Sequence, residues 1–160
     1  MNAFVVDLEV SIAEGLEKHV PTASIMQNWI YAVLAKIGYE NSAQICVRVV
    51  EQQEMIDLNY KFRKVNKATN VLSFPYQALP GVNIPFLGDL VICADVVSQE
   101  AKQQSKTFEQ HWAHLLVHGV LHLLGYDHIK ETDALKMEKL EIEIMSELGF
   151  PNPYGEIYTS

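Results

Sequence analysis

Apolar side chains follow two different periodicities in the first half of the chain, and each predicts one type of element. Between Thr22 and Gly38 they recur every four positions, which is the spacing of one helix face. A second helical pattern covers about 51–63. Residues 3–10 and 44–50 instead alternate apolar and polar side chains, as half-buried strands do. We therefore expect two strands, each followed by a helix.

The second half of the chain is mainly helical. Two apolar segments, 70–75 and 88–94, resemble strands and are separated by a loop rich in proline and glycine. Helical patterns then cover about 95–104, 107–124 and 131–148. Strands that come early and helices that come late predict an α+β fold, a small mixed β-sheet packed against several helices. With 160 residues and no internal repeat, the chain is expected to form a single domain over 1–160.

The charge balance is acidic, yet one segment of the chain is basic. Twelve Lys and Arg residues against twenty Asp and Glu give a formal net charge of −8, which argues against coating duplex nucleic acid by bulk electrostatics. Lys61, Arg63, Lys64 and Lys67 nevertheless place four cations within seven residues. We expect an anionic partner to be bound locally, at this cluster.

The sequence shows neither a membrane-spanning segment nor a secretory signal peptide. No apolar run approaches the length of a membrane span, and the N-terminal residues lack the basic region of a signal peptide. The two cysteines, Cys46 and Cys93, lie in apolar, strand-like segments and are expected to be buried, reduced thiols. These observations predict a cytoplasmic protein without a membrane partner.

Three histidines are spaced to hold one metal ion. His118 and His122 are one helical turn apart, so their imidazoles can converge on the same ion. Gly125 can end the helix in a left-handed conformation, and His128 can then return to the pair. Three neutral imidazoles leave one tetrahedral position open, which is typical of a catalytic zinc site. We predict one Zn²⁺ ion at His118, His122 and His128, on a late helix and the turn that follows it.

For the polar residues near these histidines, the sequence leaves two roles open. His111 and His114 lie on the same helix face as His118 and His122, and are expected either to line the site or to be exposed. Asp127 precedes His128 and is a candidate acceptor for the second N–H of a ligand, although a surface or capping role fits it equally.

The same histidine spacing occurs in metzincin peptidases. Their motif places a glutamate directly after the first histidine, where it serves as the general base. In this chain that position is Gly119. A metallopeptidase is therefore the weaker alternative.

The segment from His118 to His128, HGVLHLLGYDH, resembles the signature of the bacterial YbeY family of zinc-dependent endoribonucleases. Further similar segments are 58–63, 69–75, 88–92 and 111–114, so that the resemblance covers most of the chain. It implies that His118, His122 and His128 bind zinc and that Arg63 is the functional arginine of the cleft. The chain departs from the family at Asn70, where an aspartate is usual, and this change could alter a local hydrogen bond.

The resemblance and the residues together predict a single-strand-specific endoribonuclease that acts in ribosomal RNA maturation and ribosome quality control. Its partners would be ribosomal RNA precursors and the ribosome or its small subunit. Zinc would activate water or polarise the scissile phosphate, and Arg63 would stabilise the negative charge of the phosphate. The attacking group, water or the 2′-hydroxyl of the RNA, stays open. So does a non-catalytic alternative, a zinc-containing factor that binds RNA during ribosome assembly.

Overall fold

The computed structural model describes residues 6–77, 80–81, 84–127 and 130–155. Its elements follow in the order β1 (Val6–Ile12), η1 (Glu17–His19), α1 (Ala23–Ile37), β2 (Ala43–Val50), α2 (Gln52–Arg63), β3 (Val71–Pro75), β4 (Phe86–Cys93), α3 (Ala94–Gln103), α4 (Phe108–Leu123) and α5 (Glu131–Glu147). The predicted helices are all present. The loop predicted between 75 and 88 is shorter, because β4 begins at Phe86.

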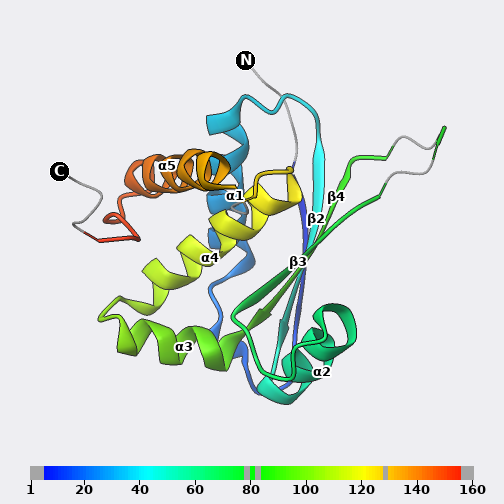
Figure 1. Cartoon of the computed structure of the whole chain (residues 1–160), viewed down its shortest axis with the longest axis vertical. Coiled ribbons are helices and arrows are strands. Elements are labelled where there is room, and N and C mark those ends of the chain that lie inside the picture. Colours follow the sequence, from blue (N-terminus) through cyan, green and yellow to red (C-terminus); the bar gives the residue numbers. More distant parts are fainter. Residues whose placement is uncertain (1–5, 78–79, 82–83, 128–129, 156–160) are drawn as a thin grey trace.

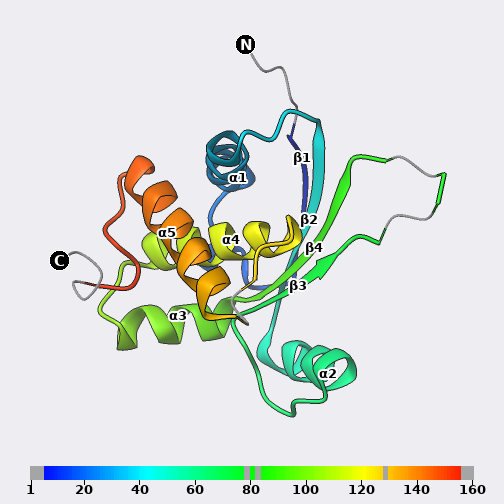
Figure 2. The same ribbon diagram turned by 45° about the horizontal axis from the view of Figure 1, so that its top comes forward.

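The strands form one mixed sheet in the order β1-β2-β4-β3. β1, β2 and β4 are parallel, whereas β3 runs antiparallel to β4 and forms an edge of the sheet. Helices α1 and α4 cover one face of the sheet, α5 packs against these two helices, and α2 lies on the opposite face (Figures 1 and 2). The predicted α+β fold is thus confirmed. No helix among the described residues is long and apolar enough to cross a membrane.

The alternation predicted for the second strand separates a core face from a half-buried face. Ile45, Val47 and Val49 are buried in the main core beneath α1 and α4. Cys46 points the other way and is only half-buried, so its predicted burial is wrong, whereas Cys93 is fully buried as expected. Burial, together with a hydrogen bond from its Sγ to Glu9, raises the pKa of Cys46 to about 11.

Gly88 allows three elements to come together next to the C-terminal end of α4. Its φ of 147° lies in a region that favours glycine. A Cβ atom there would overlap the carbonyl oxygen of Phe74 on β3 and would lie 2.8 Å from Cδ2 of Leu123 on α4. The missing side chain therefore lets the β3–β4 pair contact the last turn of α4.

We expect Gly88→Ala to reduce the free energy of unfolding by about 2–5 kcal/mol, because backbone strain and overpacking add. Gly15→Ala is the matched control: its φ is 89°, but no atom lies within 4 Å of the added Cβ, so only strain of about 1–2 kcal/mol remains. Urea unfolding of both variants measures the difference. Equal losses for the two variants would show that the close contact at Gly88 is unimportant.

Candidate metal centre

Helix α4 places two of the predicted zinc ligands side by side. Its start is fixed by Thr107, whose side chain accepts a hydrogen bond from the backbone N–H of Gln110. One turn before the end of the helix, Nε2 of His118 and Nε2 of His122 are 3.1 Å apart. Their rings are nearly perpendicular, with centroids 4.6 Å apart. The two imidazoles therefore converge on one point.

This geometry suits a shared metal ion. Two nitrogens bound at 2.0–2.1 Å to a tetrahedral zinc lie about 3.3 Å from each other, close to the separation seen here. Nδ1 of His118 is 3.1 Å from Oε1 of Glu141, and because an ionised carboxylate only accepts, this nitrogen carries the proton. Nε2 of His118 then presents its lone pair toward His122. The donor set fits zinc at the two positions that are described.

Glu141 is a buried carboxylate on α5 with three hydrogen-bond donors. Oε1 accepts from Nε2 of His114 at 2.7 Å and from Nδ1 of His118, and Oε2 accepts from the hydroxyl of Tyr154 at 2.9 Å. Burial would raise the pKa of Glu141, but the hydrogen bonds from the two histidines outweigh burial and hold it at about 2. Glu141 is therefore ionised at neutral pH.

His114 and His111 belong to different networks, and neither side chain is exposed. Burial lowers the pKa of His114 despite the neighbouring carboxylate, so this histidine is a neutral donor to Glu141 beside the candidate metal centre. Nε2 of His111 lies 2.9 Å from Oε1 of Glu100, which also accepts from Nδ2 of Asn70 at 3.0 Å. Asn70 thus donates to the Glu100 carboxylate, whereas an aspartate at this position would be repelled by it because both groups carry negative charge.

Arg63 brings a positive charge to the same cleft. It is the last residue of α2, and its Nη2 donates to the carbonyl oxygen of Ser73 on β3 at 3.2 Å. The guanidinium also lies 5.6 Å from the centroid of the Phe74 ring. Arg63, His118 and His122 line one cavity of about 370 Å³ between α4 and β3.

The third predicted ligand, His128, lies outside the described residues. The turn that leads to it is described: Gly125 has a φ of 98°, and Tyr126 N–H donates to the carbonyl oxygen of Leu121 at 3.0 Å. The predicted left-handed turn at Gly125 is therefore present. Within the described ranges, no group of three His, Cys, Asp or Glu side chains is placed to hold a metal ion. The three-histidine site stays a prediction.

The environment of Gly119 is unsuited to a peptidase base. Gly119 is buried against β4, and a Cβ atom there would lie 2.9 Å from Cδ2 of Leu90. A glutamate at this position would have to displace the buried Leu90 side chain. No carboxylate lines the histidine cleft in the part of the chain that the structure describes.

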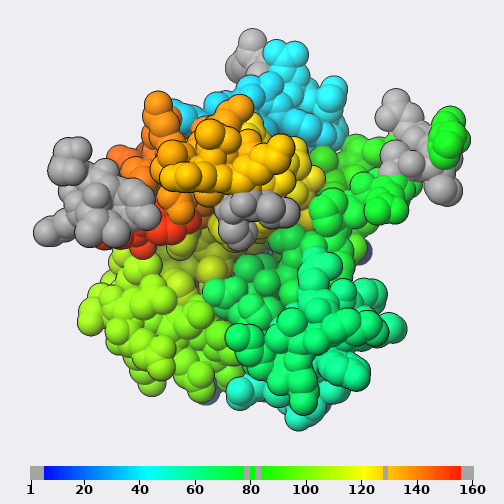
Figure 3. All heavy atoms as spheres, in the orientation of Figure 1, coloured from blue at the N-terminus to red at the C-terminus, as the bar shows by residue number. Residues whose placement is uncertain are grey.

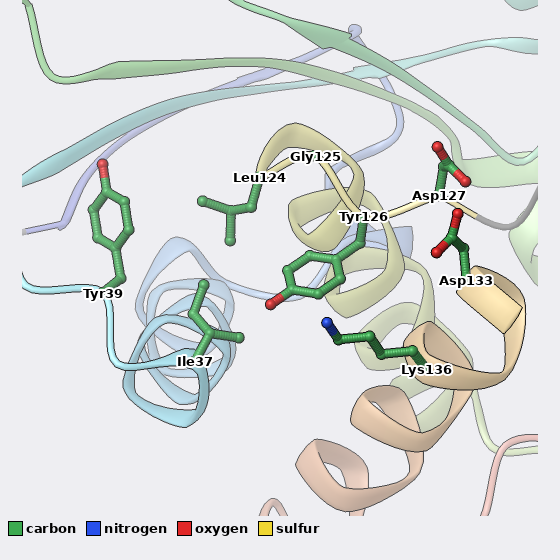
Figure 4. Close-up of a pocket in the computed structure, with 8 residues that line it drawn as sticks. All are labelled: Ile37, Tyr39, Leu124, Gly125, Tyr126, Asp127, Asp133 and Lys136. Carbon is green, nitrogen blue, oxygen red and sulfur yellow. The ribbon is translucent and has the colours of Figure 1, made fainter.

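A second cavity, of about 480 Å³, lies beyond the C-terminal end of α4 (Figure 4). Asp127 and Asp133 stand side by side at one end of it, and the side chains of Tyr126 and Lys136 both extend into it. Although this cavity is larger than the histidine cleft, neither His118 nor His122 lines it. It lacks the paired imidazoles that point to metal chemistry, so we place the site in the smaller cleft.

The sequence analysis did not identify Glu141 or Tyr154. Glu141 does carry a signal, because it occupies the apolar face of α5 together with Met137, Ile144 and Met145. An acidic residue at such a position needs buried partners. Tyr154 has no comparable signal, since it follows the last helix in an irregular segment.

Comparisons with known proteins bear on the fold and on the family of this chain. The chain resembles the solution structure of TM1509 from Thermotoga maritima with a TM-score of 0.56 and 25% sequence identity, over 91% of this chain and 92% of that one. Residues 13–149 match the protein family described as Endoribonuclease YbeY. This match includes the described cleft residues Arg63, His118 and His122, and it spans most of the chain. The chain therefore belongs to the YbeY family of endoribonucleases, which act in ribosomal RNA maturation.

Proposed function

We propose that this protein is a zinc-dependent, single-strand-specific endoribonuclease that cleaves ribosomal RNA precursors and takes part in ribosome quality control. One observation carries the proposal: Nε2 of His118 and Nε2 of His122 lie 3.1 Å apart in a cleft that the Arg63 guanidinium also lines. His128 would complete the ligand set from the turn after α4. The proposed catalytic unit is one domain, acting in the cytoplasm on the ribosome or its small subunit.

Each described cleft residue has a distinct part in this proposal. A bound zinc ion would supply Lewis acidity at a phosphoryl oxygen or lower the pKa of a water molecule. Arg63 binds the phosphate and stabilises the negative charge that develops on it during cleavage. Its hydrogen bond to Ser73 and its contact with Phe74 hold the guanidinium at the cleft before RNA arrives.

The buried carboxylate orients the first ligand. By accepting from Nδ1 of His118, Glu141 fixes the tautomer that directs Nε2 into the cleft. No carboxylate of the described ranges lines the cleft, so none of them is placed there as a general base. Both routes, attack by water and attack by the RNA 2′-hydroxyl, fit the proposal.

Cleavage of a ribosomal RNA fragment by two variants separates metal binding from phosphate binding. His122→Ala should lose both bound zinc and cleavage, since it removes a ligand. Arg63→Lys should keep its zinc but cleave about 10²–10³-fold more slowly, because an ammonium cannot reproduce the guanidinium contacts with a phosphate. Rates and zinc content are measured on identically purified proteins.

The matched control is His19→Ala, an exposed histidine on η1, which should cleave like the unmodified protein. Equal cleavage by all preparations would identify a contaminating ribonuclease. Tight RNA binding without any cleavage dependent on His122 would instead favour the non-catalytic assembly factor.

The role of Glu141 is tested by Glu141→Gln, which keeps the size of the side chain but removes its charge. We expect zinc affinity to fall about 10–100-fold, because the ligand His118 loses its charged hydrogen-bond partner. Competition with a chromophoric chelator measures the dissociation constant. Glu131→Gln, an exposed change on the same helix, is the control. Unchanged zinc affinity in a folded Glu141→Gln protein would contradict an orienting role.

A further inference from the structure

The last turns of α2 expose aromatic rings beside the cleft. Tyr60 is 57% exposed and Phe62 is 49% exposed, which is unusual for large rings on a helix that packs against a sheet. Phe62 also contacts Phe74 of β3, with ring centroids 5.1 Å apart and planes at 66°. In the space-filling view α2 forms a lobe at the edge of the molecule, so these rings are on a protruding part of it (Figure 3).

Cations lie next to each of these rings. The Nζ atom of Lys61 is 5.3 Å from the Phe62 centroid, and that of Lys64 is 5.9 Å from the Tyr60 centroid. Neither lysine forms a salt bridge with a carboxylate of the described residues. In a chain with a net charge of −8, this is a local surface of aromatic and positive groups.

Phe62 and Phe74 also line a groove of about 330 Å³ on the α2 side of the sheet. Lys61 supplies a free positive charge there, whereas Arg48 is ion-paired with Glu54 and Asp89 is a carboxylate at the groove wall. The negative charge of Asp89 disfavours a phosphate next to it in the groove. The groove is thus suited to an uncharged flat group, with anions held at its rim.

The groove and the histidine cleft meet at β3. Side chains alternate along a strand, so Ser73 and Pro75 line the cleft while Phe74 lines the groove. Arg63 joins the two, because it lines the cleft and lies over the Phe74 ring. A strand of RNA with its phosphate at Arg63 would therefore have neighbouring nucleotides within reach of the groove.

We propose that Phe62 and Phe74 form a stacking platform for unpaired RNA bases that flank the cleaved phosphate, with Lys61 binding an adjoining phosphate. Every base has a π-face, so such a platform is tolerant of sequence. Bases inside a duplex are already stacked on their neighbours, so the platform selects unpaired RNA. This inference rests on the proposed function, because it identifies the RNA that the cleft receives.

Affinity for a short fluorescein-labelled single-stranded RNA tests the platform, with every protein carrying His122→Ala to prevent cleavage. Phe62→Leu keeps an apolar side chain but removes the π-face, and we expect it to weaken binding roughly tenfold. Phe62→Trp should bind like the unmodified surface. Leu135→Ala, at a 57%-exposed apolar residue of α5, is the control and should have no effect. When the same RNA is annealed to its complement, Phe62→Leu and Phe62→Trp should bind it with equal affinity.

An RNA of the same length with abasic residues gives an independent readout. The His122→Ala protein that retains Phe62 should bind the abasic RNA more weakly than the intact RNA. Adding Phe62→Leu should not reduce the affinity for the abasic RNA any further. Equal affinity of Phe62, Phe62→Leu and Phe62→Trp for the single strand would overturn the platform and leave the rings for a protein partner.

The platform and the proposed function can fail separately. Cleavage by proteins that retain His122 is measured in parallel. If cleavage requires His122 but binding is insensitive to residue 62, the platform is wrong and the nuclease stands. If binding depends on residue 62 but no RNA is cut, the platform stands and the nuclease is wrong.

Discussion

Glu141 is an ionised carboxylate inside the core, and the geometry of the cleft depends on how the protein compensates for its burial. An unpartnered carboxylate in such a place is strongly unfavourable. Here His114, His118 and Tyr154 each donate a hydrogen bond to it. These bonds connect α4, α5 and the segment after α5, so the same interaction that satisfies the carboxylate also sets the orientation of His118.

The segment after α5 is part of this arrangement. The hydroxyl of Tyr154 reaches Glu141, and Nζ of Lys106 donates to the carbonyl oxygen of Pro153 at 2.8 Å. These polar contacts tie the chain beyond the last helix to α5 and to the loop before α4, while Phe150 packs against Trp29 in the core. On the other side of the cleft, β3 is the edge strand that carries Ser73 toward the histidines and Phe74 toward α2. The side chain of Arg63 extends from the end of α2 to this edge strand, where it donates to Ser73 and lines the cleft.

Local patterns predicted most of the fold and the centre of the site, because both depend on short-range periodicity. The turn spacing of His118 and His122 and the helix-ending Gly125 are properties of adjacent residues. Contacts between distant residues leave no such pattern: nothing local to His118 shows that Glu141, on another helix, accepts a hydrogen bond from its Nδ1. Cys46 was assigned to the core because its strand is apolar, but alternation puts it on the half-buried face. Only the family resemblance indicates a cleft position for Arg63, because that position depends on the end of α2 lying beside β3, a contact between distant elements.

The central claim is that the histidines of α4 and of the turn after it hold one zinc ion with an open position. X-ray absorption at the zinc edge of the zinc-loaded protein tests this claim most directly. The account predicts about three imidazole nitrogens and a further light atom, at roughly 2.0–2.1 Å, with no sulfur shell. A sulfur ligand near about 2.3 Å, or a zinc ion surrounded mainly by water oxygens, would contradict it.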